Sequence, residues 1–584
     1  MLKHLKNRTL LSLLSFIIGL LYLYLTHVTI TQKDPNHFTL YSSIPQKVTL
    51  HIRTKNPSAS FQCNQTPYPF PQIAKHDYWY KGEEQLTLSL KRGENSCSGQ
   101  ELTGEIRQKI GYFEGFILFL LLILPLYGLL FSTIQTLIDR EKKKRTITPM
   151  QLKWYGSGML SHPLLLLILL LGVTVRLFYF NKYGVVVFQH DWQGHINFIK
   201  YMAENWSLPI PTKGWEYPQQ PLYYLILGYL YNLSSSMGYS ESETMIQLGY
   251  ISLLSSALFL YYGYRFVLLL TDNRVVQLTA ITFISLTPSL VYMSTRINND
   301  ALVMALAVMT LYSLLKSFQS NFRDHFYRAL LLVSLLFLTK ISTLSIELLF
   351  FTLLLIGYYH ATPERTQQLK KQLYLFGLVG IFLLSFTLLH NYLPLDSTFH
   401  MVNSAKFPKQ TLDSLGFDYF GTFHLIELIQ KGESHVFGLD AIRHSFLTYQ
   451  YGTMLFGEFD YSYFTNKNGF LHPTMQVIYL LATLFIVGFI SYLVNFRKES
   501  LISKLLFMTL TINFILVIRF IFLYPSICNT DFRYLVSSFA ILAFLFGRGL
   551  YYLSGHKVIR RVIQLQLILL ILSELLFFIF LIYP

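Results

Sequence analysis

The chain has 584 residues, of which 52% are hydrophobic and only 13% are charged. This composition is too apolar for a fold built around a water-soluble core, and it predicts a polytopic membrane protein. The formal net charge of +16 does not indicate nucleic acid as a partner, because Lys and Arg fall mainly in short loops between apolar spans and form no basic stripe with interleaved aromatic residues.

Residues 1–30 predict a signal-anchor helix. Lys3, Lys6 and Arg8 precede an apolar run from Thr9 to about Ile30, which is long enough to span a bilayer. A cleaved signal peptide is the alternative, but no small-residue cleavage site follows the run. We therefore expect an uncleaved anchor, with the segment that follows it outside the membrane.

Residues 31–110 predict a small external β-rich domain. Apolar and polar residues alternate at 48–52 and 86–90, and clusters of Pro, Gly and Asn separate these patches. If the domain faces an oxidising compartment, Cys63 and Cys97 can form a disulfide; two unpaired thiols are the alternative.

Residues 111–154 contain a second predicted span, near 112–136, and the densest basic run of the chain, at 139–145. The positive-inside bias places that run in the cytoplasm. The third predicted span, near 160–180, leads out again and belongs to a membrane core that we expect to occupy residues 155–584. This topology places Asp191 on the outer side, in an outer loop at 181–243.

A short apolar piece from Pro221 to about Leu233 decides the topology of everything downstream. It is too short for a full span and rich in Tyr, so we expect an interfacial or re-entrant helix; a full crossing is the alternative. If the piece does not cross, four later basic loops all fall inside, as the positive-inside bias favours. These loops lie near 323–328, 365–371, 497–504 and 557–561.

The predicted fold class is mainly α: a polytopic membrane helix bundle with a β-rich external domain near the N-terminus. The three spans described above and the ten remaining spans named at the end of this paragraph total about thirteen. A long polar outer loop at 392–473 is expected to be functional or a small subdomain. The remaining spans are expected near 245–270, 275–293, 300–317, 327–340, 343–359, 373–391, 474–495, 503–524, 534–553 and 562–582.

The outer loops carry the charged and titratable residues that could take part in a reaction. A carboxylate near the lipid boundary is partly desolvated, which raises its basicity and suits it to take a proton from a hydroxyl group. Cations there suit the phosphate of a lipid-linked substrate. The candidate groups on the outer side are His190, Asp191, Arg296, Asp300, Lys340, Asp531 and Arg533.

Each candidate also has a structural interpretation. Asp191 is alternatively a solvated loop acid or a helix cap, and Asp300 is alternatively a helix cap. Lys340 and Arg533 are alternatively interfacial anchors whose stems lie in lipid, with Asp531 as the surface partner of Arg533. The spacing of His190 and His195 is poor for two ligands on one helix face, which argues against a zinc site. Within the spans themselves, Arg176 indicates either a polar cavity or a side chain that reaches the interface.

The order of these features resembles the GT-C class of integral-membrane glycosyltransferases, especially the protein O-mannosyltransferase and aminoarabinose transferase relatives of glycosyltransferase family 39. The resemblance covers roughly residues 155–584. It is carried by His190-Asp191 with His195, Gln220-Pro221-Leu222-Tyr223-Tyr224, Asn299-Asp300-Ala301-Leu302, Thr339-Lys340, and Asp531-Phe532-Arg533-Tyr534-Leu535-Val536. The external domain and the first two spans have no counterpart in that pattern.

The resemblance implies that a sugar leaves a polyprenyl phosphate carrier and joins an acceptor outside the membrane, usually with inversion. It also implies roles: Asp191 as catalytic base, Asp300 as supporting acid, Lys340 and Arg533 as cations that hold the donor phosphate, and Tyr217, Gln220 and Tyr224 as lining of the entrance. In the related oligosaccharyltransferase subunit the acids hold a divalent metal. Here the first loop lacks a second adjacent acid, which counts against a metal.

The sequence thus predicts a multi-pass glycosyltransferase of the cytoplasmic (inner) membrane, with its active site facing the periplasm or the outside. The acceptor is open among protein, lipid and another glycan. One alternative is a glycan polymerase or ligase that uses a diphosphate-linked donor. A transporter or flippase of lipid-linked glycans, and a noncatalytic scaffold, are alternatives from other classes.

Overall fold

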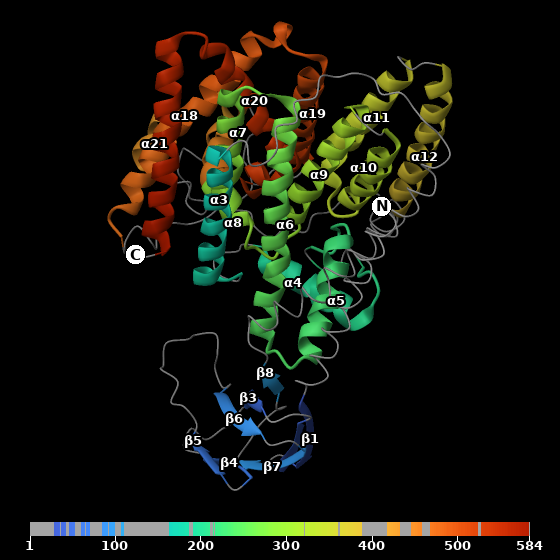
Figure 1. Ribbon diagram of the computed structural model, residues 1–584, viewed down its shortest axis with the longest axis vertical. Coiled ribbons are helices and arrows are strands. Elements are labelled where there is room, and N and C mark those ends of the chain that lie inside the picture. The colour runs from blue at the N-terminus through green and yellow to red at the C-terminus, as the bar shows by residue number, and fades with distance from the viewer. Residues whose placement is uncertain are drawn as a thin grey trace. The chain divides into compact units, whose positions relative to one another are not determined.

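The computed structural model of the protein divides into two compact units, Met1–Thr148 with Tyr229–Leu248, and Pro149–Gly228 with Gly249–Pro584 (Figure 1). The predicted anchor up to residue 27, the predicted second span, the basic run at 139–145 and His190 lie outside the described residues. The structure describes residues 28–34, 37–42, 46–52, 60–64, 66–69, 84–90, 93–99, 107–109, 163–185, 191–210, 214, 216–319, 322–359, 363–387, 417–432, 445–457, 468–523 and 527–582.

The first unit contains two antiparallel sheets. The five-stranded sheet has the order β1 (Val28–Asp34), β2 (His37–Ser42), β7 (Gly93–Gly99), β4 (Ser60–Cys63) and β5 (Thr66–Pro69). The three-stranded sheet has the order β6 (Glu84–Leu90), β3 (Gln46–Ile52) and β8 (Arg107–Lys109). Whether these sheets form a separate domain outside the membrane stays a prediction.

The registers of the strands explain how the sequence pattern forms these sheets. In β3 and β6, Val48 is paired with Leu88 and Leu50 with Leu86, so the alternating apolar residues of both strands are in register. In β4 and β7, Cys63 lies directly opposite Cys97, and the two residues form a disulfide. Of the two alternatives that the sequence leaves open for these cysteines, the structure has the disulfide.

The rest of the described chain is helical. Among the described residues, seven helices are long and apolar enough to cross a membrane, as expected for a helical membrane protein: Pro163–Tyr183, Glu241–Leu270, Asp300–Phe318, Leu471–Val494, Leu501–Phe522, Phe532–Leu553 and Lys557–Ile582. The total of about thirteen spans stays a prediction. The helical elements are α3 (Pro163–Tyr183), α4 (Trp192–Asn205), α5 (Leu222–Ser236), α6 (Glu241–Leu270), α7 (Arg274–Leu286), α8 (Pro288–Met293), α9 (Asp300–Gln319), α10 (Phe322–Phe337), η3 (Ile341–Thr343), α11 (Leu344–Tyr359), α12 (Pro363–Thr387), α14 (Phe417–Gly421), α15 (Leu425–Lys431), α16 (Phe446–Phe456), α18 (Leu471–Val494), η8 (Phe496–Lys498), α19 (Leu501–Leu523), η9 (Ile527–Thr530), η10 (Phe532–Ser538), α20 (Phe539–Leu553) and α21 (Lys557–Ile582).

The segment of the span predicted at 275–293 is not one continuous helix, because it breaks into α7 and α8. Pro288 has no N–H to continue the helix, and its ring disfavours helical geometry at the residue before it. Thr287 accordingly has φ −52° and ψ 123°, which is not helical. Helix α7 therefore has 13 residues, too few to span a bilayer by itself.

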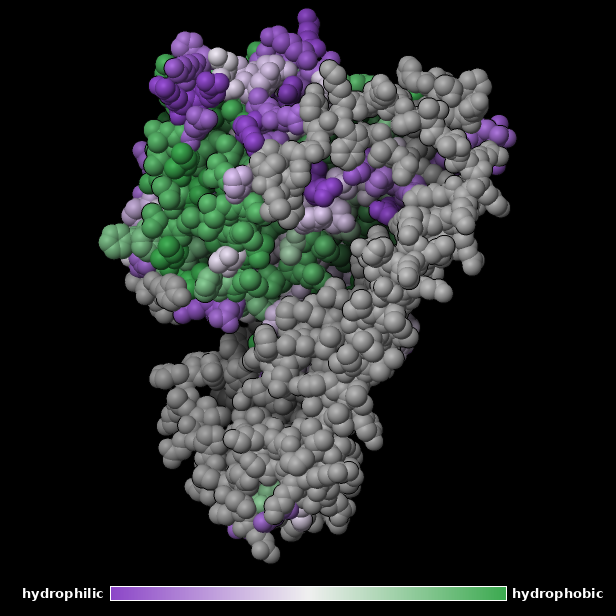
Figure 2. Space-filling view, viewed as in Figure 1, coloured by the Kyte–Doolittle hydropathy of each residue, from purple (hydrophilic) through white to green (hydrophobic). Residues whose placement is uncertain are grey.

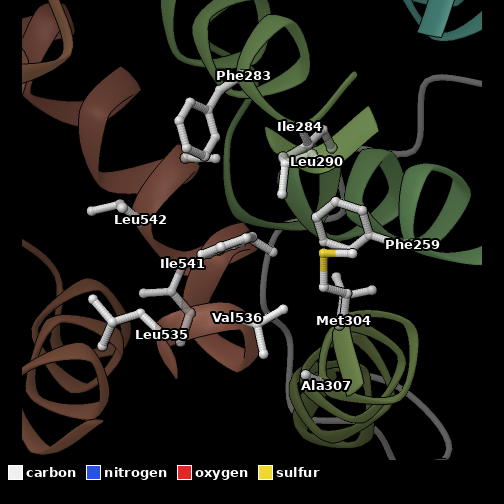
Figure 3. Close-up of a cluster of buried hydrophobic side chains, with 14 of the residues drawn as sticks. Phe259, Phe283, Ile284, Leu290, Met304, Ala307, Leu535, Val536, Ile541 and Leu542 are labelled. Carbon is white, nitrogen blue, oxygen red and sulfur yellow. The ribbon is translucent and has the colours of Figure 1, made fainter. Parts of the chain in front are cut away.

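The centre of the helical unit is formed by α9 and by η10 with α20. In both spans 83% of the most apolar window is buried, compared with 44% in α3, α18 and α21. Figure 3 shows the contact region, where side chains from α6, α7, α8, α9, η10 and α20 converge. The labelled residues are Phe259, Phe283, Ile284, Leu290, Met304, Ala307, Leu535, Val536, Ile541 and Leu542.

The outer helices keep large apolar side chains on the surface. Leu167 of α3, Leu480 of α18 and Ile568 of α21 are each more than half exposed. The face drawn in Figure 2 carries a broad hydrophobic area, with hydrophilic residues gathered at one end of the helices. An apolar surface of this kind is expected where helices contact lipid.

Glycines let the helix backbones approach closely at the centre. A Cβ at Gly549 of α20 would collide with the carbonyl oxygen of Gly488 in α18, and a Cβ at Gly547 would lie 2.7 Å from the carbonyl oxygen of Val276 in α7. Small residues at such crossings are typical of membrane helices, where close packing replaces the hydrophobic effect as the driving force.

Arg176 neither opens a cavity nor reaches the interface, because it is 1% exposed and hydrogen-bonded in the interior. Its guanidinium donates to the carbonyl oxygens of Ser285 (2.5 Å), Ile284 (3.2 Å) and Gly172 (2.9 Å), and to Ser256 Oγ (2.7 Å). The Ser285 and Ile284 carbonyls belong to the last turn of α7, whose intrahelical partners are missing beyond the break. Arg176 therefore caps the C-terminus of α7.

The long insertion predicted at 392–473 contributes α16 to the interior. Gln450 Nε2 donates to the carbonyl oxygen of Thr530 at 2.5 Å, and the backbone N–H of Phe532 donates to Thr453 Oγ1 at 3.0 Å. Ser289 Oγ of α8 donates to the carbonyl oxygen of Met454 at 2.5 Å. Helix α16 thus fixes the backbone on both sides of Asp531, where the predicted site begins.

Candidate functional site

Segments that are far apart in the sequence bring a group of charged side chains together in the second unit. They come from the start of α4, the loop before α5, the turn before α9, the turn before η3 and the start of η10. We call this group the charged cluster; its members are Asp191, Glu216, Arg296, Asp300, Lys340, Asp531 and Arg533.

Arg533 joins two carboxylates of the charged cluster. Its Nη2 lies 2.6 Å from Asp191 Oδ2, and its Nε lies 3.4 Å from Asp531 Oδ2. Asp531 begins η10, and its Oδ1 accepts a hydrogen bond of 3.0 Å from the backbone N–H of Arg533. Asp191 occupies the N-cap position of α4, but its side chain makes no capping hydrogen bond. Its carboxylate instead forms the ion pair with Arg533.

A second ion pair links Asp300 and Lys340, with 2.5 Å between Oδ1 and Nζ. Asn298 Nδ2 donates to the other carboxylate oxygen at 3.1 Å, and Asn298 Oδ1 accepts from the Asp300 backbone N–H at 3.2 Å. The Tyr534 ring contacts both pairs, because Lys340 Nζ and Arg533 Cζ are each 5.5 Å from its centroid. One aromatic ring thus makes cation–π contacts with two cations that are each paired with a carboxylate.

The loop before α5 is held to these elements by side-chain amides. Asn299 Nδ2 donates to Gln219 Oε1 and to the carbonyl oxygen of Thr339, both at 3.1 Å. The backbone N–H of Ile341 donates to Gln220 Oε1 at 3.2 Å. Gln220, predicted to line the entrance, is buried and serves as a structural link.

Tyr224 and His195 form an interior pair. Tyr224 is fully buried, its hydroxyl lies 2.8 Å from His195 Nδ1, and its ring stacks on Phe198 at a centroid distance of 3.9 Å. Burial lowers the pKa of His195 to about 3, so the imidazole is neutral. Tyr217 packs on the same Phe198, with a centroid distance of 5.4 Å, and is partly exposed. The structure places Tyr224 inside the protein and Tyr217 nearer its surface.

The expectation of raised basicity at Asp191 is wrong. Burial acts in the expected direction, but the Arg533 guanidinium, with a smaller effect from Arg296, outweighs it and holds the pKa of Asp191 well below its usual range. The sequence identifies a carboxylate near a low-dielectric boundary, whereas the ion pair with a residue 342 positions later depends on the fold. In this arrangement Asp191 is a firmly ionised anion.

Glu216 is the member of the charged cluster that the sequence analysis missed. Its side chain is 6% exposed. Burial, followed by the charge of Asp191, raises the pKa of Glu216 to about 7, although Arg533, Gln219 and Lys340 act in the opposite direction. The one signal in the sequence is an acidic residue directly before Tyr217, in a stretch already predicted to face the site.

Arg296 is the cation of the charged cluster with no ion-pair partner among the described residues. It is 3% exposed, its Cζ lies 4.7 Å from the centroid of the Tyr292 ring, and its buried Nε has no hydrogen-bond partner. It contributes to the electrostatic environment of both Asp191 and Asp300. A buried guanidinium whose Nε–H has no partner among the described residues is suited to bind an anion.

Of the predicted site residues, the structure gathers Asp191, Asp300, Arg296, Lys340, Asp531 and Arg533 in the charged cluster, and His195 beside it. Within the described parts of the chain, no three His, Cys, Asp or Glu side chains are grouped closely enough to hold a metal ion. The chemistry available to the cluster is anion binding by three cations together with proton transfer by carboxyl groups.

No family model matches the chain, and no curated protein matches its sequence. Among solved structures, it is similar to the arabinosyltransferase EmbB from Mycobacterium smegmatis, with 9% sequence identity and a TM-score of 0.29. The alignment covers 94% of this chain and 64% of the length of that protein. A TM-score this low does not establish a shared fold, so a function for this chain depends on its own residues.

Proposed function

We propose that the protein is a multi-pass membrane glycosyltransferase that moves a sugar from a polyprenyl phosphate carrier to an acceptor hydroxyl. The observation that carries the proposal is the charged cluster. In it the Asp191–Arg533 and Asp300–Lys340 pairs gather at the ends of membrane helices with Arg296, which has no ion-pair partner among the described residues. Cations bind the phosphate, carboxylates bind the acceptor, and the apolar helices give a polyprenyl chain a surface to lie against.

The direction of the helices supports a site on the outer side of the cytoplasmic membrane. Asp531 and Arg533 lie at the start of η10 and α20, and the far end of that span leads into the basic residues of 557–561. Asp300 begins α9, whose far end leads to the basic residues of 323–328 at the start of α10. Basic loops favour the cytoplasm, so the charged cluster would face the periplasm or the outside.

In the proposed reaction the donor phosphate binds first to Arg296. It then also binds Lys340 and Arg533, which are paired with carboxylates before the donor arrives. As Arg533 turns to the phosphate, Asp191 is released to accept a hydrogen bond from the acceptor hydroxyl. The hydroxyl oxygen attacks the anomeric carbon, its proton passes to a carboxylate of the charged cluster, and the carbon–oxygen bond to the phosphate breaks with both electrons going to the phosphate. Asp300 keeps Lys340 in place throughout, since a charge-assisted hydrogen bond orients the ammonium.

The test is transfer by the purified protein in liposomes, supplied with undecaprenyl phosphate or diphosphate carrying a labelled hexose or pentose, and with a mixture of protein, lipid and glycan acceptors. The proposal expects product from the monophosphate donors. Product only from diphosphate donors would indicate a polymerase or ligase, and movement of the donor between leaflets without product would indicate a flippase. Either result would contradict the proposal.

A further inference from the structure

The acids of the charged cluster differ in whether a cation is paired with them. This difference bears on which acid can accept the proton that sugar transfer must release. Asp191, Asp300 and Asp531 each lie within ion-pair distance of Arg533 or Lys340. For Glu216 the described residues include no cation within that distance. Its neighbours across the cluster are Asp191 at the start of α4, Arg533 of η10 and Lys340 before η3.

The backbone of α4 makes room for this carboxyl beside Asp191. A Cβ at Gly194 would lie 2.7 Å from Glu216 Cγ, so the Glu216 side chain lies directly on the first turn of α4. The Gly194 backbone N–H donates to the Asp191 carbonyl oxygen at 3.1 Å, which ties that turn to Asp191. Any larger residue at position 194 would force the Glu216 side chain to shift from this place.

The hydrogen bonds of the neighbouring amides orient Glu216. The carbonyl oxygen of Thr339 can only accept, so it fixes Asn299 Nδ2 toward itself, and the same Nδ2 donates to Gln219 Oε1. The amide nitrogen of Gln219 is then the group that donates to the Glu216 carboxyl, with which Gln219 forms a hydrogen bond. This bond uses the Glu216 carboxyl group as an acceptor.

We propose, on the basis of the glycosyltransferase function above, that Glu216 takes the proton that the acceptor hydroxyl releases, while Asp191 holds that hydroxyl in line with the anomeric carbon. The O–H bond breaks, the new glycosidic bond forms, the carrier phosphate leaves with the electron pair, and Glu216 becomes the neutral acid. Charge is balanced, because the leaving phosphate gains the negative charge that Glu216 loses. Two carboxyl groups whose environments separate their pKa values are the usual basis for such a division of roles.

The pH dependence follows from the state that Glu216 must have. Burial and the charge of Asp191 raise the pKa of Glu216 to about 7. A proton acceptor must start ionised, so the transfer rate is expected to fall as the pH drops through about 7 and to level off above it.

The test compares the pH profile of transfer by the wild-type protein, Glu216→Gln and Glu216→Asp in the liposome assay. Glutamine keeps the size and the hydrogen bond from Gln219 but cannot take a proton, so we expect a loss of about 10²–10⁴-fold and no acidic limb. Aspartate should retain a limb at a lower rate. The matched control is Glu204→Gln, which makes the same chemical change at an exposed position of α4 and should leave the profile unchanged.

A second measurement separates failure of this inference from failure of the proposed function. Infrared difference spectra between pH 6 and pH 8 should show a buried carboxylic acid band that is lost in Glu216→Gln and persists in Glu204→Gln. Wild-type transfer with a profile that Glu216→Gln does not alter would overturn the role of Glu216 and leave the glycosyltransferase standing. No transfer by the wild-type protein would overturn both.

Discussion

The ion pair between Asp191 and Arg533 makes a prediction about stability that follows from its geometry. At 2.6 Å between Nη2 and Oδ2, and with an effective dielectric constant of about 20, the gross attraction is roughly 6 kcal/mol. Dehydrating the two groups, whose side chains are 15% and 10% exposed, offsets part of this energy. Arg533→Gln leaves a buried carboxylate unpaired, and such changes cost about 3–5 kcal/mol.

Adding Asp191→Asn to Arg533→Gln should recover part of that loss, because no unpaired charge is left at position 191. Asp531 keeps its 3.0 Å hydrogen bond from the backbone N–H of residue 533 in every variant. A double-mutant cycle should therefore give a coupling energy of about 1–3 kcal/mol. The assay is unfolding by SDS in mixed micelles, followed by circular dichroism, with Arg560→Gln as a matched exposed control expected to stay within about 0.5 kcal/mol.

The pH dependence of this coupling has a defined sign. Because the pKa of Asp191 is depressed in the folded protein, the pair stabilises the fold fully above the unfolded pKa of about 3.9, and the contribution is lost only as the pH falls through the depressed value. The ionisation of Asp191 itself should therefore cause no change in the coupling between pH 6 and pH 8, and any change in that range is expected to come from Glu216. Additive effects of the two substitutions at pH 7 would refute the pair as the structure has it.

Three further predictions concern the framework around the charged cluster, each measured by the same SDS titration unless stated. Gly549→Ala should lower the unfolding free energy by about 1–3 kcal/mol because its methyl group meets backbone, whereas Gly380→Ala, with nothing within 4 Å, should not lower it. Arg176→Met removes the donors to two buried carbonyl groups of α7 and should cost about 1–3 kcal/mol for each; an unchanged midpoint would rule out the proposed capping role. Cys97→Ser should lower the stability of the sheet unit by about 2–4 kcal/mol, measured by limited proteolysis, with Cys528→Ser as the control.

Hydropathy predicts the long helices well because a bilayer imposes a minimum length on any span. The predicted spans at 245–270, 300–317 and 562–582 correspond to α6, α9 and α21. It fails at 275–293, where apolar side chains continue through a break in the backbone. Pro288 was the available signal, and its effect on Thr287 outweighs the apolar character of the segment.

The sequence allowed us to predict which residues form the site better than how their charges are paired. Charged residues at the ends of apolar spans are visible in the sequence, and Asp191, Asp300, Lys340 and Arg533 do lie together. Which cation neutralises which acid depends on long-range packing, so the direction of the Asp191 pKa was predicted with the wrong sign. Glu216 was missed for the same reason, since no periodic pattern marks its burial.

The most direct test of the proposed function is sugar transfer in membranes that contain either the wild-type protein or Asp191→Asn, supplied with undecaprenyl phosphate carrying a labelled sugar. Both proteins count as folded if they are expressed equally and if their SDS unfolding midpoints differ by no more than the loss of the ion pair explains. We predict that the wild-type protein forms product and that Asp191→Asn loses about 10²–10⁴-fold in rate. Product formed at the same rate by a well-folded Asp191→Asn protein would contradict a catalytic role for the charged cluster.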